Sequence, residues 1–161
     1  MVRELVQAAS TYHRPIQETT RPLLTIEMTD LEAKEENYPS IAGLEHVYLE
    51  DSYVISLLFD KAALRFELLL VLTEDHEAYS APNSGEQYCY IRNAVLSFKN
   101  PLEVEWISIS MRPTTDVNNS IDFGNIDFLS FVGNRYYMAG DWGEVRFLCD
   151  AVELDVKRPS E

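Results

Sequence analysis

The densest group of potential metal ligands and proton-transfer groups in the sequence lies between residues 74 and 79. The run Glu74–Glu77 combines three carboxylates with His76, and Tyr79 follows after one residue. A zinc site needs an imidazole and carboxylates to converge on one ion at about 2.0–2.2 Å. Neighbouring residues of a loop rarely converge in this way, and no second histidine is close in the sequence. We therefore interpret the run as a solvated acidic loop, with a metal site and a protein-binding site as the alternatives.

A second set of oxygen-bearing side chains begins at Asp116 and has part of the pattern of a calcium loop. The sixth position, where the sharp turn of such a loop requires glycine, is Ile121, and the twelfth position is Asp127 instead of glutamate. We interpret this segment as a surface loop. The sequence thus predicts neither a metal nor another cofactor.

The motifs of the common enzyme classes are absent from the sequence. There is no G-x-S-x-G elbow, phosphate loop, dinucleotide fingerprint or H-E-x-x-H pair. His13 and His46 have no nucleophile or carboxylate that the sequence places beside them. These absences favour a protein that is not an enzyme, although an active site can also be assembled from scattered residues.

Aromatic residues beside acidic ones are the strongest candidates for protein binding. Trp142 lies in a turn between Gly140 and Gly143, next to Asp141 and Glu144. Because turns lie at the surface, we expect Trp142 to be exposed, whereas most other aromatic residues belong to the core. Tyr88 and Tyr90, which flank Cys89, form a similar group. The predicted interaction residues are His76, Tyr79, Asp141, Trp142 and Glu144.

Hydrophobic side chains alternate with polar ones over most of the chain, which predicts β-strands. These strands must therefore position the residues named above. We expect strands over residues 23–28, 44–50, 52–59, 63–73, 88–98, 102–109 and 128–132, and a final pair within 136–156. The pattern places Leu44, His46 and Tyr48 on one face of their strand. It places Tyr53, Ile55, Leu57 and Phe59 on one face of the next.

Two slips of the hydrophobic phase point to the way in which the sheet is bent. One occurs after Trp106, where the apolar positions move to Ile107 and Ile109, and the other lies between Cys149 and Val152. A slip of one residue is the pattern of a β-bulge, and bulges let strands bend from one sheet into another. The sequence therefore predicts a mainly β fold, an antiparallel sandwich or partly open barrel with at most one or two short helices.

The chain is strongly acidic. Its 161 residues contain 13 lysines and arginines against 27 aspartates and glutamates, a formal net charge of −14. Such a charge repels nucleic acids and anionic membrane surfaces and attracts a basic protein, although it also serves solubility alone. We expect a cytoplasmic protein, because the sequence shows no signal peptide and no membrane span. Its two cysteines, Cys89 and Cys149, are interpreted as reduced structural thiols.

Prolines divide the chain into two regions. His13-Arg-Pro15 and Arg21-Pro22 interrupt any long element near the N-terminus. We expect a flexible arm over residues 1–22 and a single β-rich domain over 23–161. The arm also offers a route to a homo-oligomer, if it packs on a neighbouring copy.

One pattern resembles a class of small bacterial proteins with no assigned function. It consists of His76-x-x-Tyr79-x-x-Pro82-x-x-Gly85-Glu86-x-Tyr88-Cys89-Tyr90, an apolar strand, and Trp142-Gly143-x-Val145-x-Phe147, within residues 44–156. The Trp-Gly end of the hairpin is also similar to that of some toxin-immunity proteins. The latter resemblance implies a non-enzymatic acidic protein that binds a partner.

The sequence supports two hypotheses for function. The first is an acidic protein-interaction module, in its narrower form an immunity-type inhibitor that covers a basic partner. The alternative is a small-molecule-binding or enzymatic β domain whose pocket lies inside the sandwich or at the mouth of the barrel.

Overall fold

The computed structural model describes residues 33–117 and 119–157, so the predicted arm over residues 1–22 and the predicted strand over 23–28 lie outside the described residues. The mainly β prediction is confirmed, because the described chain forms eleven strands and one short 3₁₀ helix. The elements are β1 (Glu36–Asn37), η1 (Tyr38–Ser40), β2 (Val47–Phe59), β3 (Ala63–Leu72), β4 (Cys89–Lys99), β5 (Leu102–Ile109), β6 (Thr114–Thr115), β7 (Ile121–Asp122), β8 (Ile126–Val132), β9 (Arg135–Gly140), β10 (Gly143–Leu148) and β11 (Ala151–Asp155).

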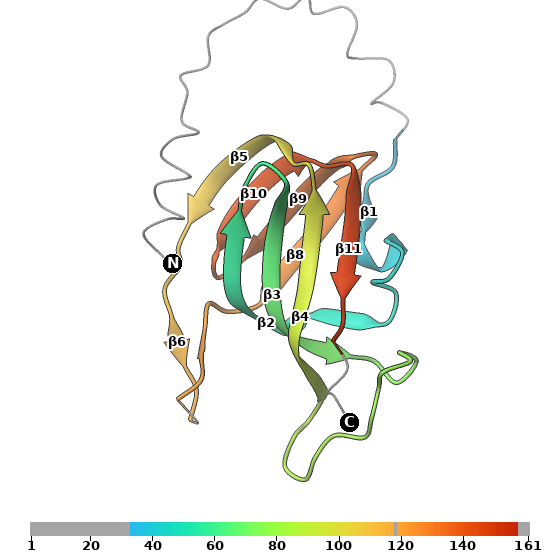
Figure 1. Cartoon of the computed structure of the whole chain (residues 1–161), viewed down its shortest axis with the longest axis vertical. Coiled ribbons are helices and arrows are strands. Elements are labelled where there is room, and N and C mark those ends of the chain that lie inside the picture. The colour runs from blue at the N-terminus through green and yellow to red at the C-terminus, as the bar shows by residue number, and fades with distance from the viewer. Residues whose placement is uncertain (1–32, 118, 158–161) are drawn as a thin grey trace, which may run out of the picture.

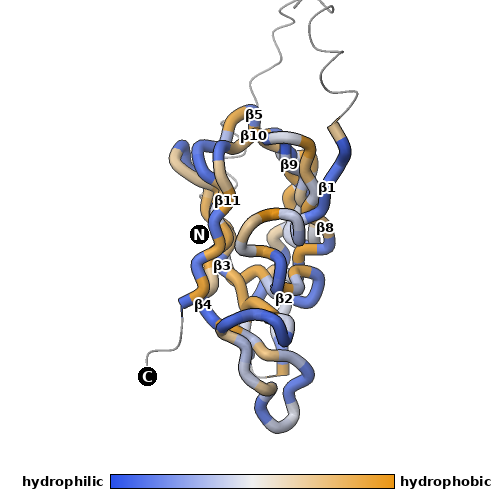
Figure 2. The backbone as a smooth tube through the Cα atoms, turned by 90° about the vertical axis from the view of Figure 1, so that its right-hand side faces the viewer, coloured by the Kyte–Doolittle hydropathy of each residue, from blue (hydrophilic) through white to orange (hydrophobic). Residues whose placement is uncertain are grey.

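Three antiparallel sheets pack together without closing into a barrel. The larger two form a sandwich, one with the strand order β1-β8-β9-β10-β5 and the other with the order β11-β4-β3-β2. Figure 1 shows the four-stranded sheet in front of the five-stranded one, and Figure 2 shows the two sheets edge-on as separate layers. The third sheet is the small hairpin of β6 and β7, which projects from the body.

Aromatic and aliphatic side chains from the facing sides of the two sheets form the core. Phe66 of β3 contacts Trp142 edge to face, with ring centroids 4.9 Å apart. Phe98 of β4 contacts Phe147 of β10 at the same centroid distance. Each large side chain buried in this way contributes about 1.5–3 kcal/mol to stability. The alternation along the strands thus directs one face of each sheet toward the other sheet.

The first long strand differs from the prediction. Residues 47–59 form one strand instead of two, and Val47, Leu49 and Val54 face the core, whereas Tyr48 and Tyr53 are exposed. The predicted grouping is therefore wrong for Tyr48 and Tyr53, whereas Leu57 is buried in the core and Phe59 packs against it, as the prediction for that part of the strand requires. The cause is the register: the six residues of β2 from Tyr48 to Tyr53 face only three of β3, Val71 to Leu69, so three extra residues bulge out of the ladder.

The two predicted slips have different origins. The slip after Trp106 is a β-bulge, because Glu144 and Val145 of β10 pair with Ser108 and Trp106 of β5, which leaves Ile107 as the extra residue. The slip after Cys149 marks the passage of the chain from β10 in one sheet to β11 in the other. The second slip is thus the end of one strand and the start of the next.

The turn between β9 and β10 also differs from the prediction. Trp142 is fully buried, although it lies in a turn. The absence of a side chain at Gly140 makes room for its ring, since a Cβ atom at Gly140 would lie 2.6 Å from the indole Nε1 of Trp142. Within the described residues, no helix has the length and hydrophobicity that a membrane span requires.

Candidate interaction surface

The register of the four-stranded sheet places two tyrosines on either side of Val71. Tyr48 of β2 and Tyr90 of β4 both pair directly with this residue of β3 and therefore lie on the same face of the sheet. Val71 is only 2% exposed but does not belong to the main core cluster. The tyrosines therefore cover Val71 on the outer face of the sheet, away from the five-stranded sheet.

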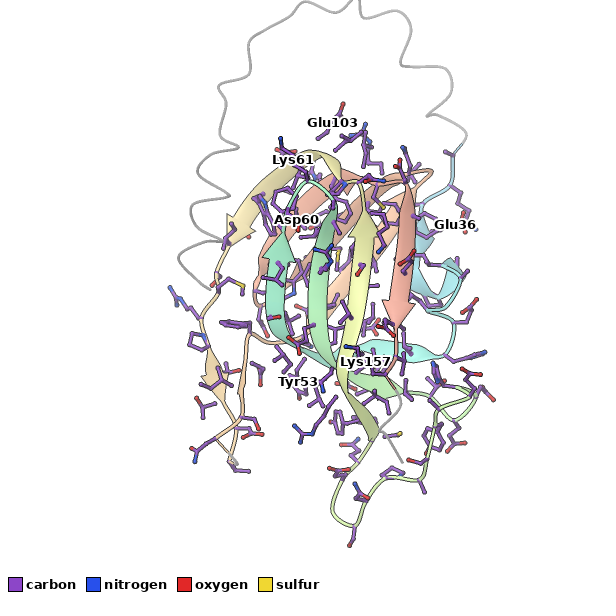
Figure 3. The ribbon with its side chains drawn as sticks, in the orientation of Figure 1. Glu36, Tyr53, Asp60, Lys61, Glu103 and Lys157 are labelled. Atoms are coloured by element: carbon purple, nitrogen blue, oxygen red, sulfur yellow. The ribbon has the colours of Figure 1, made fainter. Side chains whose placement is uncertain are left out.

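Tyr53 and Tyr88 complete the group. Tyr53 pairs with Leu69, two residues along β3 from Val71, and so has the same orientation. The ring of Tyr88 contacts that of Tyr48 at a centroid distance of 6.5 Å and that of Tyr90 at 6.1 Å. Tyr48 is 40% exposed and Tyr53 37%, and Figure 3 shows Tyr53 at the lower end of the sheet. We call Tyr48, Tyr53, Tyr88 and Tyr90 the tyrosine surface.

Carboxylates border the tyrosine surface. A hydrogen bond to Asp51 raises the pKa of the Tyr88 hydroxyl, and the negative charge of Asp51 adds to this effect. The amide of Gln87 donates a second hydrogen bond, 3.2 Å long, to the same hydroxyl. Burial raises the pKa of Tyr90, and Tyr53, Asp51 and Glu86 raise it further. Asp51 and Glu86 thus lie close enough to the rings to make the surface electronegative.

The bulge in β2 holds Asp51 in this position. Ser52, at its end, is completely buried, and its hydroxyl accepts a 2.9 Å hydrogen bond from the backbone N–H of Val71. The same hydroxyl donates a 2.6 Å hydrogen bond to the carbonyl of Tyr48. The serine therefore replaces ladder hydrogen bonds that the bulge interrupts. By closing the bulge, it sets both the orientation of Tyr53 and the place of Asp51.

A second acidic group lies beside the bulge. Glu50 accepts a 2.6 Å hydrogen bond from the hydroxyl of Tyr38, whose pKa is raised by burial and by this contact. Burial raises the pKa of Asp127, and the negative charges of Asp141 and Glu50 raise it further. The bulge thus joins two acidic regions, since Asp51 borders the tyrosine surface and the preceding residue, Glu50, belongs to this second group.

The predicted interaction residues do not form one site. Asp141 is exposed and belongs to the acidic group beside the bulge. Glu144 lies on the other sheet, where it accepts a 2.6 Å hydrogen bond from the hydroxyl of Tyr137. Trp142 is buried in the core, so its expected exposure was wrong. Its indole N–H is the one buried side-chain donor of the described residues that has no hydrogen-bond partner.

His76 and Tyr79 lie in the loop between β3 and β4. The Nδ1 atom of His76 accepts a 3.1 Å hydrogen bond from the backbone N–H of Ala78. Tyr79 is half-buried and packs against the hydrophobic core. Within residues 33–117 and 119–157, no three His, Cys, Asp or Glu side chains come together in a way that could hold a metal ion.

The sequence drew attention to Tyr88 and Tyr90 as a pair that flanks Cys89, but these two were not among the predicted interaction residues, and Tyr48, Tyr53 and Asp51 were missed. They were missed because of the bulge in β2, which changes which side chains of the strand face the core. Hydrophobic alternation does not reveal how many residues such a bulge contains. Ser52 and the two acids before it, Glu50 and Asp51, separate the apolar and aromatic residues 47–49 from those at 53–55. That interruption is the trace of the bulge in the sequence.

Comparison with known proteins adds no relative. No protein-family model matches the chain, and neither a curated protein nor a solved structure matches it. The resemblance to small bacterial proteins and to immunity proteins therefore stays a hypothesis. Any argument for function must rest on the residues and their arrangement.

Proposed function

We propose that this protein is a non-enzymatic interaction module that binds a basic protein through the tyrosine surface and its carboxylates. The observation that carries the proposal is the cluster of four partly exposed tyrosines beside Asp51 and Glu86. In Figure 1, no other described element lies in front of this sheet. An immunity-type inhibitor that covers a basic toxin surface is a narrower form of the same proposal.

The chemistry of the surface supports this function. Tyrosine offers a large, rigid contact area together with a hydroxyl that can form hydrogen bonds, and it is enriched among the residues that dominate binding energies. The net charge of −14 attracts a basic partner over a longer range. The rings would thus contribute most of the affinity, and the carboxylates would accelerate association and select the partner.

Affinity capture at stepped salt concentrations tests the proposal. The immobilised protein is exposed to a lysate of its source, and the retained proteins are identified. We expect one stoichiometric basic protein that leaves the column at high salt. Its association rate should fall about tenfold or more when the salt is raised from low to physiological concentration. An association rate that does not depend on salt would contradict electrostatic steering.

A matched pair of variants locates the site. The double variant D51N/E86Q removes two negative charges at the tyrosine surface. The double variant E103Q/E105Q removes two from exposed positions of β5, and Figure 3 shows Glu103 at the opposite end of the molecule. We expect the first pair to lose most of the captured protein and the second to retain it. Equal losses would mean that only the net charge matters.

A further inference from the structure

We propose that the tyrosine surface is an aromatic cage for the guanidinium group of an arginine carried by the partner. This inference rests on the proposed function and names the group that the surface recognises. Opposite charges attract one another in general, and the inference goes further by placing one cation at a defined position. There the cation stacks on a tyrosine ring and forms hydrogen bonds with a carboxylate.

The rings of the tyrosine surface meet edge to face. The planes of Tyr48 and Tyr88 are inclined by 64°, and those of Tyr88 and Tyr90 by 84°. The planes of neighbouring rings are therefore steeply inclined to one another, and the cluster presents aromatic faces in more than one direction. A cation within about 6 Å of such a face is attracted by the ring quadrupole. A flat stack of the same rings would offer only its two outer faces.

The other sheet already contains the contact that we infer. The guanidinium carbon of Arg146 lies 5.9 Å from the ring centroid of Tyr137. The hydroxyl of that tyrosine donates a hydrogen bond to Glu144. Tyr88 and Asp51 repeat the pair of tyrosine and carboxylate. Among the residues that the structure describes, however, no arginine or lysine stands over a ring of the tyrosine surface.

The carboxylates favour arginine over lysine. Asp51 has two oxygens, each with two lone pairs, so its contact with Tyr88 leaves acceptor sites open. A guanidinium can stack on a ring with its plane and at the same time donate a forked pair of hydrogen bonds to a carboxylate. An ammonium group is a more strongly hydrated point charge and lacks the planar fork. An arginine therefore matches both the rings and the acids.

An NMR titration of the full chain tests the inference. The probe is N-acetyl-arginine amide, which carries a single positive charge, and the control is N-acetyl-citrulline amide, which is similar in shape but uncharged. We expect the arginine probe to shift the ring signals of the four tyrosines in a saturable way. The citrulline probe should leave these signals unchanged, and N-acetyl-lysine amide should bind more weakly than the arginine probe.

Variants assign the contact to individual groups. Tyr88→Leu removes the central ring and should weaken binding of the arginine probe about two- to fivefold. Asp51→Asn keeps the fold and should weaken it to a similar extent. Tyr137→Leu, on the other sheet, should have no effect. Amide spectra of each variant show that the protein remains folded.

The outcomes separate this inference from the proposed function. Equal shifts with citrulline, no shifts with arginine, or shifts that Tyr137→Leu abolishes would overturn the cage. If the partner captured from the lysate is still lost in D51N/E86Q, the proposed function stands without the cage. If arginine binds but no partner is captured through this surface, the surface still binds a guanidinium group, but the proposed function and the assignment of that group to a partner both fail.

Discussion

At the scale of single residues, Ser52 has an influence that its size does not suggest. Its hydroxyl holds the backbone of Val71 and the carbonyl of Tyr48 together across the bulge. In Ser52→Ala, the buried N–H of Val71 loses its acceptor, which costs about 1–3 kcal/mol of unfolding free energy. Urea unfolding measures this loss. Ser84→Ala, in an exposed loop, is the control and should change stability by less than about 0.5 kcal/mol.

The same variant also tests how the surface is held. Because the bulge positions Tyr53 and Asp51, we expect Ser52→Ala to shift the ring signals of the tyrosine surface while those of Tyr137 stay in place. An unchanged tyrosine spectrum would show that the sheet alone positions these side chains.

Asp127 provides the pH dependence at this scale. Its pKa is raised above 3.8 by burial and by the negative charges of Asp141 and Glu50, so its charged form is disfavoured in the folded protein. This penalty is fully present above the raised pKa and disappears as the pH falls below 3.8. Asp127→Asn should therefore stabilise the protein at pH 7, by at most about 0.5 kcal/mol, and have no effect in acid.

Urea unfolding between neutral and acidic pH measures the effect of Asp127→Asn. Asp155→Asn makes the same change of charge at an exposed position of β11 and is the control. A gain in stability that is equally large in both variants, or that persists in acid, would contradict the repulsion between the three carboxylates.

At the scale of the elements, the hairpin of β9 and β10 depends on a close approach at Gly140. A Cβ atom there would lie 2.1 Å from the carbonyl oxygen of Asn125, and backbone cannot yield as a side chain can. We expect Gly140→Ala to lose about 3 kcal/mol. Gly133→Ala has open space and only a positive φ of 60°, so it should lose about 1 kcal/mol. Similar losses in the two variants by thermal or urea unfolding would show that the approach at Gly140 is loose.

The strands themselves were largely predictable, because alternation reports a half-buried sheet directly. The elements 63–73, 88–98 and 102–109 agree closely with β3, β4 and β5, and the bulge after Trp106 left a visible slip of phase. The bulge in β2 did not, since it lies between two runs that each alternate well. Periodicity within a run reveals nothing of the number of residues that loop out between runs.

The candidate site was less predictable than the fold. Tyr88 and Tyr90 were visible in the sequence as a pair that flanks Cys89, but nothing there placed them in the predicted interaction site. Their neighbours Tyr48 and Tyr53 come from another strand, and only the register of β2 on β3 brings the four together. Trp142 can be buried because Gly140 beside it has no side chain. The general rule that turns lie at the surface takes no account of such a contact.

At the scale of the whole molecule, the net charge opposes the compact state. Like charges repel one another more strongly when the chain is folded, and salt screens this repulsion. Raising the salt from about 0.01 M to about 0.15 M shortens the Debye length from about 30 Å to about 8 Å. We expect the melting temperature to rise by about 2–4 °C for each kcal/mol of repulsion that is screened. Calorimetry measures it, and a melting temperature that falls with salt would contradict the expectation.

The passage from β10 to β11 has a consequence for the order of events during synthesis. The inner strand β4 pairs with β3 on one side, but its other partner, β11, covers residues 95–99 with residues 151–155. Until that late segment leaves the ribosome, β4 presents an unpaired edge beside the apolar side chains of Leu96 and Phe98. Such an edge is a template for pairing with another chain. The nascent protein therefore passes through a stage at which a chaperone can recognise it.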